Sequence, residues 1–334
     1  MSKIGRSNIY LTTTIIITIT IAILLIHLFL IGSVKASLNL TIKTDKQSYL
    51  GEEIVQISGN LTINGSPVTD SLVAIQVNYP SGKLFLIRTL QIGSGGGNHE
   101  LEILEVFSCN RYGEPKDSFK PGETAYLKIV WRNNSNSSKT FVLTYYIQYE
   151  DGTPMLACPS FSGTVDPNAT NINMVGVPIS SDAPEGNVVA YINLYSKLPE
   201  TYGKPYCPEK NATFTISSTS SSSTEEISNQ LQSSTDSFTL TFKAPRKPVG
   251  GNYTVYATAF YEGELAFATL EFELKLLGDL NGDNIIDMKD IGIVCKAYMS
   301  RPGDSNWNPD ADFNGDQIVD MKDVGTVCSR YMDP

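Results

Sequence analysis

One twelve-residue stretch near the C-terminus occurs twice and decides the architecture of that end of the chain. The first copy reads Asp279-Leu-Asn281-Gly-Asp283-Asn-Ile285-Ile-Asp287-Met-Lys-Asp290, and the second reads Asp312-Phe-Asn314-Gly-Asp316-Gln-Ile318-Val-Asp320-Met-Lys-Asp323. The copies lie 33 residues apart and agree at 14 of 21 positions when each is extended through Met299 or Met332. After each stretch, apolar residues recur at i, i+3, i+4 and i+7, which predicts a helix with one buried face. These residues are Ile291, Val294, Cys295 and Tyr298, and then Val324, Val327, Cys328 and Tyr331.

The repeated stretches carry oxygen-bearing side chains at steps 1, 3, 5, 9 and 12, which is the ligand spacing of a calcium loop. Oxygen-only donors favour Ca²⁺ over Zn²⁺. Four carboxylates within twelve residues repel one another unless a cation lies among them. The sequence therefore predicts two Ca²⁺ sites, and the alternative is a polar turn that binds no metal. The predicted ligands are Asp279, Asn281, Asp283, the Ile285 carbonyl, Asp287 and Asp290, and then Asp312, Asn314, Asp316, the Ile318 carbonyl, Asp320 and Asp323.

This loop–helix duplication, with Asp at step 12 and the connector Arg301–Ala311, resembles a dockerin module, an EF-hand-like fold, over residues 277–332. It departs from the calcium-loop pattern at step 6, where Asn284 and Gln317 replace glycine. The resemblance implies a small pair of helices and a cohesin-like protein partner. It also implies that Ile286 and Val319 pair the loops. The partner-binding residues it implies are Met288, Lys289, Lys296, Met321, Lys322 and Arg330, although Lys289 and Lys322 could instead only soften the charge of the loops.

Residues 37–275 alternate short β-prone runs with clusters of Gly, Pro, Asn and Asp, which is typical of antiparallel sandwiches. The early strands, which start at Leu38–Thr44, and the late strands, which start at Ser237–Lys243, resemble two halves of one immunoglobulin-like (Ig-like) domain of the macroglobulin-repeat or archaeal surface type. We predict a mainly β chain with an outer Ig-like sandwich split between residues 37–92 and 235–276, and a second Ig-like sandwich, residues 98–216, inserted in it. A Ser/Thr-rich linker follows at 217–234 and the dockerin-like domain at 277–334. Three sandwiches in series are the alternative. The expected strands of the inserted domain include Met155–Ala157.

The N-terminal segment, residues 1–36, combines Lys3 and Arg6 with a long apolar stretch. It predicts a hydrophobic helix that is either a cleaved signal peptide or a membrane anchor, with the rest of the chain extracellular at the cell surface. Eight Asn-x-Ser/Thr sequons agree with export and predict a glycoprotein, although a chain merely rich in these residues is the alternative. They start at Asn39, Asn60, Asn64, Asn133, Asn136, Asn168, Asn211 and Asn252.

The cysteines suggest disulfides, because the predicted location is oxidising. Cys109 and Cys207 lie at the ends of the first and last strands of the inserted domain, so we favour that pair and leave Cys158 free, although three pairings are possible. Cys295 and Cys328 occupy the same place in the two copies of the repeat. They either pack between two helices or join them by a disulfide.

The chain is acidic, with a net charge of −10, and lacks a basic run, so nucleic acid is a poor partner. It has two histidines, one of them in the N-terminal segment, and no catalytic motif. We therefore predict a non-catalytic surface protein whose calcium module attaches to a partner or braces the adjacent Ig-like domain. The alternative is an accessory or glycan-binding component of a polysaccharide-degrading system, with glycan bound by an exposed Trp131 or tyrosine side chain.

Overall fold

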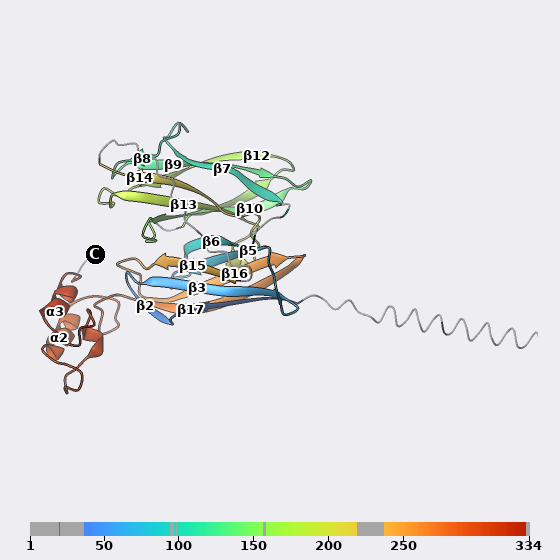
Figure 1. The fold of residues 1–334 in the computed structure, drawn as a ribbon. Helices are drawn as coiled ribbons and strands as arrows, with labels where there is room; N and C mark the ends of the chain where they lie inside the picture. Colours follow the sequence, from blue (N-terminus) through green and yellow to red (C-terminus); the bar gives the residue numbers. More distant parts are fainter. Residues whose placement is uncertain are drawn as a thin grey trace, which may run out of the picture. The chain divides into compact units, whose positions relative to one another are not determined.

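A computed structural model describes Thr20 and residues 37–331, apart from residues 94–96, 98, 156, 157 and 219–236. Within this part of the chain the protein is mainly β, as predicted: its strands form four sheets, and two α-helices lie near the C-terminus (Figure 1). The predicted export segment, apart from Thr20, and almost all of the Ser/Thr-rich linker lie outside the described residues. Among the residues described, no helix combines the length and apolar character needed to cross a membrane.

Two of the sheets combine strands from before residue 93 with strands from after residue 236 and enclose one apolar core. Within β3, for example, Val55 and Ile57 are buried while Gln56 and Asn60 are exposed, because successive side chains of a strand point to opposite faces. One sheet has the order β1 (Leu38–Thr44), β3 (Ile54–Ile63) and β15 (Ser237–Lys243), with β4 (Ser66–Pro67) beside β3. The other has the order β2 (Ser48–Leu50), β17 (Glu264–Lys275), β16 (Gly251–Tyr261), β5 (Ser71–Asn78) and β6 (Leu84–Ile92).

The other two sheets come from the intervening chain and share a second core around Trp131. The Trp131 ring is fully buried, its Nε1 donates to Asn173 Oδ1 at 2.7 Å, and Phe141 packs edge-on against it. The idea that an exposed Trp131 binds glycan is therefore wrong. One sheet has the order β11 (Ser160–Val165), β10 (Lys139–Tyr149), β13 (Gly186–Tyr195), β14 (Lys210–Ile216) and β8 (Ser118–Phe119), and the other has β12 (Thr170–Pro178), β9 (Thr124–Asn133) and β7 (Leu101–Cys109).

Strand β13 is buried on both faces because one face belongs to the second core and the other contributes Val189, Tyr191 and Tyr195 to the first. A buried ion pair joins the two groups of sheets at this layer. Arg88 Nη2 lies 2.6 Å from Glu209 Oε1, and the Arg88 guanidinium lies 3.4 Å from the centre of the Tyr191 ring. The contact between the cores is therefore a packed and charge-paired layer.

The predicted strand Met155–Ala157 lies mostly outside the described residues, because Leu156 and Ala157 are not among them; Met155 itself lies outside any strand. A strand that we did not predict, β11 (Ser160–Val165), follows and pairs with β10. This strand carries two serines and a glycine and is largely exposed, so it lacks the apolar alternation that marks a strand in a sequence.

The repeat forms two short helices, α2 (Met288–Ala297) and α3 (Met321–Cys328), which lie side by side (Figure 1). They share a small core with Ala311, which belongs to the short helix η2 (Pro309–Ala311). A second short helix, η1 (Pro199–Thr201), precedes β14.

Candidate metal centre

Both helices of the repeat begin at an aspartate that closes a capping box. The Asp287 side chain accepts from Lys289 N at 2.7 Å, and the Asp290 side chain accepts from Asp287 N at 2.8 Å. Asp320 and Asp323 repeat this arrangement at the start of α3. A capping side chain stabilises a helix by about 1 kcal/mol, so steps 9 and 12 of each loop have a structural role independent of any ligand.

The step-12 aspartates close the loops from inside. Asp290 is fully buried, and its Oδ1 also accepts from Leu280 N at 2.8 Å and from Asn281 N at 3.2 Å. Asp323 is fully buried too and accepts from Phe313 N at 2.8 Å. Each of these carboxylates therefore joins the start of its loop to the start of its helix.

The step-1 aspartates hold the turn at the tip of each loop. Asp279 accepts from Gly282 N at 2.8 Å and from Asn284 N at 2.7 Å. The equivalent bonds of Asp312 are 2.9 Å in both cases. The step-3 amides and step-5 carboxylates continue the turn by accepting from the backbone two residues further on.

Step 6 of each loop adopts the left-handed backbone that glycine usually supplies. The φ angles are 63° at Asn284 and 66° at Gln317. Asparagine tolerates this conformation well, whereas for glutamine it is strained. The second loop therefore forms the calcium-loop backbone at a conformational cost that the first loop largely avoids.

A lysine from the first helical turn lies against the outward carboxylates of each loop. Lys289 Nζ is 2.9 Å from Asp283 Oδ2 and 3.6 Å from Asp287 Oδ2. Lys322 Nζ is 3.3 Å from Asp316 Oδ2 and 3.8 Å from the step-9 aspartate. These contacts agree with the charge-softening interpretation of the two lysines, and their role in partner binding stays a prediction.

The lysines shift the ionisation of the loops. The hydrogen bond from Lys289 holds the pKa of the Asp283 carboxyl below its ordinary value, and the same bond raises the pKa of Lys289. Desolvation opposes the shift at Asp316, but the hydrogen bond from Lys322 prevails and lowers the pKa of that carboxyl. The carboxyls of Asp283 and Asp316 are therefore ionised at neutral pH.

The donor set of each loop fits a hard cation: four carboxylates, one amide and one backbone carbonyl, with no nitrogen or sulfur. In the described part of the chain, no three side chains of His, Cys, Asp and Glu lie together in a metal-binding arrangement. The carboxylates are instead turned toward backbone N–H groups and the lysines. Binding of Ca²⁺ to these residues remains a prediction.

The buried faces of α2 and α3 differ from the predicted stripe. Val294, Ala297 and Val327 are buried, whereas Cys295 and Cys328 are exposed and free. The cysteines therefore neither pack between the helices nor join them. Each lies one residue beyond the valine that faces the small core, which turns it toward solvent because successive helical residues are rotated by about 100°.

Val319 makes its backbone hydrogen bonds with Met299 and Ser300, and not with Ile286 as predicted. Val319 O accepts from Met299 N at 2.7 Å, and Val319 N donates to Ser300 O at 3.2 Å. The second loop is thus joined to the end of the first copy.

The predicted partner-binding residues fall into two groups. Met288 and Met321 are 63% and 64% exposed, and Lys296 is also exposed. Arg330 is largely covered, and its Nη2 lies 3.2 Å from Oε2 of Glu52, which lies in the turn before β3. Arg330 is therefore engaged within the chain, a contact that the sequence does not signal.

The first loop lies very close to the sheet that precedes it. A Cβ atom added at Gly250, just before β16, would lie 1.6 Å from Asn284 Oδ1. Only glycine leaves room for the Asn284 amide at this point. A groove of about 510 Å³ beside this contact is lined by Leu276, Asp279, Asn281 and Asp312 among others. The sequence shows Gly250 and Gly251 only as a turn before β16.

The predicted disulfide between Cys109 and Cys207 is not formed, and all five cysteines are free. The physical reason is the strand order. Strand β14, which follows Cys207, pairs in parallel with β8, whereas β7, which ends at Cys109, pairs with β9 in the other sheet. The first and last strands are therefore not edge neighbours. Burial in apolar surroundings raises the pKa of the Cys207 thiol to about 12, which suppresses its thiolate.

The sequons differ in accessibility. Asn133 is fully buried, which contradicts its prediction as a glycosylation site. The remaining asparagines are exposed: Asn39, Asn60, Asn64, Asn136, Asn168, Asn211 and Asn252.

Comparisons with known proteins identify no family. No protein-family model matches the chain, and no curated protein matches it. Among solved structures, the C-terminal domain of wzt has a TM-score of 0.32 at 12% identity. The match covers 39% of this chain and 87% of the wzt domain. An alkylpurine DNA glycosylase of Pseudomonas fluorescens has a TM-score of 0.27 at 14% identity, covering 35% of this chain and 30% of its own.

A CARDB domain from Pyrococcus furiosus, solved with di-metal ions, has a TM-score of 0.23 at 14% identity, covering 36% of this chain and 87% of its own. The match thus spans less than a third of the glycosylase but most of the wzt domain and of the CARDB domain. Likenesses of this size support no argument about fold family or function.

Proposed function

We propose that this chain is an exported, non-catalytic surface protein whose C-terminal repeat is a Ca²⁺-binding, dockerin-like module that braces the Ig-like sandwich before it. In this proposal residues 37–92 and 235–276 form the outer sandwich and residues 98–216 an inserted one. The contact between Asn284 and Gly250 carries the proposal, because it joins the tip of a predicted calcium loop to the last hairpin of the outer sandwich.

Two further features support bracing. The ion pair between Arg330 and Glu52 joins the turn after α3 to the turn before β3. Only Leu276, Leu277 and Gly278 separate β17 from the first loop, and Asp279 N donates to Leu276 O at 3.2 Å. A module that searches for a distant partner needs a flexible tether, and this junction leaves no length for one.

The proposed ligands are the loop residues named above, six in each copy. Bound Ca²⁺ would neutralise the four carboxylates of a loop and so remove their mutual repulsion. The chain itself forms the turn through the step-1 aspartates and fixes the loop to its helix through the step-12 aspartates. Lys289 and Lys322 each supply one positive charge to a loop. The stronger charge of the ion would displace them from the loop carboxylates.

Attachment to a cohesin-like protein is the second candidate, and one observation favours it. Met288 and Met321 occupy equivalent positions in the two copies, and both are well exposed. Exposed methionines suit an adaptable binding surface. A pull-down of cohesin-type domains with and without Ca²⁺ distinguishes docking from bracing.

The bracing proposal is tested by hydrogen exchange of the full chain in Ca²⁺ and in EDTA. We expect EDTA to speed exchange in β16 and β17, which contact the module, and to leave β9 unchanged. In Gly250→Ala the added methyl group forces Asn284 away, so the response of β16 and β17 should shrink. Gly292→Ala is the matched control, because its Cβ would meet nothing within 4 Å. Equal exchange of β16 and β17 in wild type under both conditions would contradict bracing.

Calorimetric titration tests the metal assignment separately. Wild type should bind two Ca²⁺ ions, and Asp279→Ala and Asp312→Ala should each bind one. Absence of binding by wild type at millimolar Ca²⁺ would rule out the metal sites.

A further inference from the structure

Two consecutive sequons lie at the turn between β9 and β10, and their asparagines differ in burial. The first is Asn133-Asn134-Ser135 and the second is Asn136-Ser137-Ser138. Asn133 is the last residue of β9 and is fully buried, whereas Asn136 lies three residues later and is exposed. The sequence pattern alone cannot distinguish the two asparagines, because both begin an Asn-x-Ser/Thr sequon.

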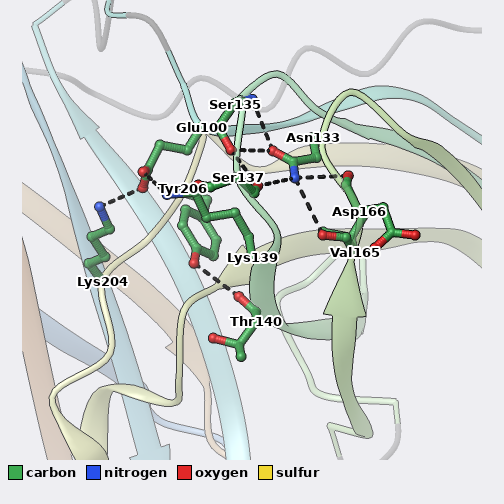
Figure 2. Close-up of polar contacts among 10 residues, drawn as sticks. All are labelled: Glu100, Asn133, Ser135, Ser137, Lys139, Thr140, Val165, Asp166, Lys204 and Tyr206. Carbon is green, nitrogen blue, oxygen red and sulfur yellow. Dashed lines mark hydrogen bonds and ion pairs between the residues drawn. The ribbon is translucent and has the colours of Figure 1, made fainter.

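The Asn133 side chain uses its whole hydrogen-bonding capacity inside the protein (Figure 2). Its Nδ2 donates to the carbonyl oxygens of Ser137 at 2.9 Å and Asp166 at 3.0 Å, with Val165 O a third, longer contact at 3.4 Å. Its Oδ1 accepts from Ser135 N at 2.9 Å and from Ser135 Oγ at 2.7 Å. An amide nitrogen has two hydrogens, so both are committed.

A glycan on Asn133 is incompatible with this arrangement. N-linked attachment replaces one Nδ2 hydrogen with a sugar carbon, which removes a donor and leaves a partly buried carbonyl without its partner. The sugar would also have to occupy space that the protein fills completely. In addition, the hydroxyl of Ser135, the third residue of this sequon, is bound to Asn133 itself.

The contacts of Asn133 also keep the second asparagine, Asn136, exposed at the tip of the turn. Asn133 ties the turn at Ser135 and Ser137 to the end of β11 and the following turn, and its backbone N donates to Ala169 O at 2.9 Å. This holds the tip of the β9–β10 turn in a fixed conformation, with Asn136, Ser137 and Ser138 all exposed.

We propose that Asn136 is an N-glycosylation site of the folded protein and that Asn133, in the preceding sequon, is a structural clamp that is not modified. The inference rests on the proposed export of residues 37–334, because glycan transfer takes place outside the cytoplasm. It does not depend on Ca²⁺ binding or on bracing.

The test is secretion of the full chain from a host that N-glycosylates exported proteins, followed by glycopeptide mass spectrometry. A second arm replaces the N-terminal segment with a host leader, so that failure of the natural segment to export is distinguishable from failure of this inference. We expect a glycan on Asn136 and none on Asn133. Ser138→Ala should remove one glycan from the secreted protein, and Ser135→Ala should remove none. A glycan on Asn133, or an unmodified Asn136 in the secreted chain, overturns the proposal.

The clamp has its own measurement in protein made without glycosylation. Asn133→Ala should lower Tm by about 5 °C or more, because several buried hydrogen bonds lose their partner. Asn136→Ala is the matched control and should leave Tm unchanged. Equal Tm values for the two variants would show that Asn133 is not a clamp.

Discussion

Replacement of Gln317 by glycine tests whether the second loop is strained at step 6. Gln317 has a φ angle of 66°, and the left-handed conformation costs a residue with a side chain about 1–2 kcal/mol. Glycine removes this cost but loses about 0.5–1 kcal/mol through the greater freedom of its unfolded chain. The net gain is about 0.5–1 kcal/mol, which is roughly a two- to fivefold change in an equilibrium constant.

Hydrogen exchange of α3 in the full chain measures this gain, because its amides exchange through opening of the second loop–helix unit. In Gln317→Gly we expect exchange of α3 to slow roughly two- to fivefold. The matched variant is Asn284→Gly in the first loop. There the relief is small, since asparagine tolerates the conformation, and the contact at Gly250 is lost. Exchange of α2 should therefore not slow.

The argument about strain is refuted if exchange of α3 in Gln317→Gly is unchanged or faster. An equal slowing of α2 in Asn284→Gly would also count against it, because the two step-6 residues would then be equivalent. Calcium should be held at one concentration throughout, since a bound ligand adds its own stabilisation.

Three further predictions concern the β-rich part of the chain. Arg88→Ala should destabilise the protein by about 3–5 kcal/mol in denaturant unfolding, because it leaves a buried carboxylate unpaired, whereas Lys243→Ala, at a more exposed ion pair, should cost less than about 1 kcal/mol. Burial alone would raise the pKa of Glu100, but hydrogen bonds from Lys139 and Lys204 lower it below its ordinary value of 4.5. The stabilisation that the Glu100 carboxylate contributes is therefore present above that pH and lost as the pH falls. Glu100→Gln should consequently flatten the fall of Tm at acid pH. Trp131→Phe should lower stability by about 1–2 kcal/mol in denaturant unfolding, because the bond to Asn173 is lost and a small void remains.

The sequence predicts much of the β architecture because its strands carry strong local patterns. Strand β1 has the predicted range Leu38–Thr44, and β15 the predicted range Ser237–Lys243. Both pair with β3, so the early and late segments share one sheet. Strands β8 and β11 escaped prediction because they are short or polar, and their pairing depends on neighbours distant in sequence.

In the repeat, spacing alone indicates the loops, the helices and the left-handed turn at step 6. It fails for side-chain direction on short helices. Cys295 matches an apolar stripe as well as Ala297 does, and only packing in three dimensions decides which of them is buried. Contacts such as Asn284 with Gly250 or Arg330 with Glu52 carry no sequence signal, because each joins residues of unrelated segments.

The pairing of β3 with β15 has a consequence for how the chain acquires its structure. The ladder joins Ile54–Ile63 to Ser237–Lys243, so it cannot form until most of the polypeptide has been synthesised. Contacts between such distant segments form slowly, because closing a long loop costs entropy before any contact compensates it. We expect the sheets of residues 101–216 to fold first as the chain is synthesised. Until β15 and β16 are available, β1 to β6 can pair only among themselves, and β3 and β5 each keep one open edge that is prone to aggregation or chaperone binding. Truncation anywhere before β15 should therefore release a chain in which β3 and β5 each keep an unpaired edge.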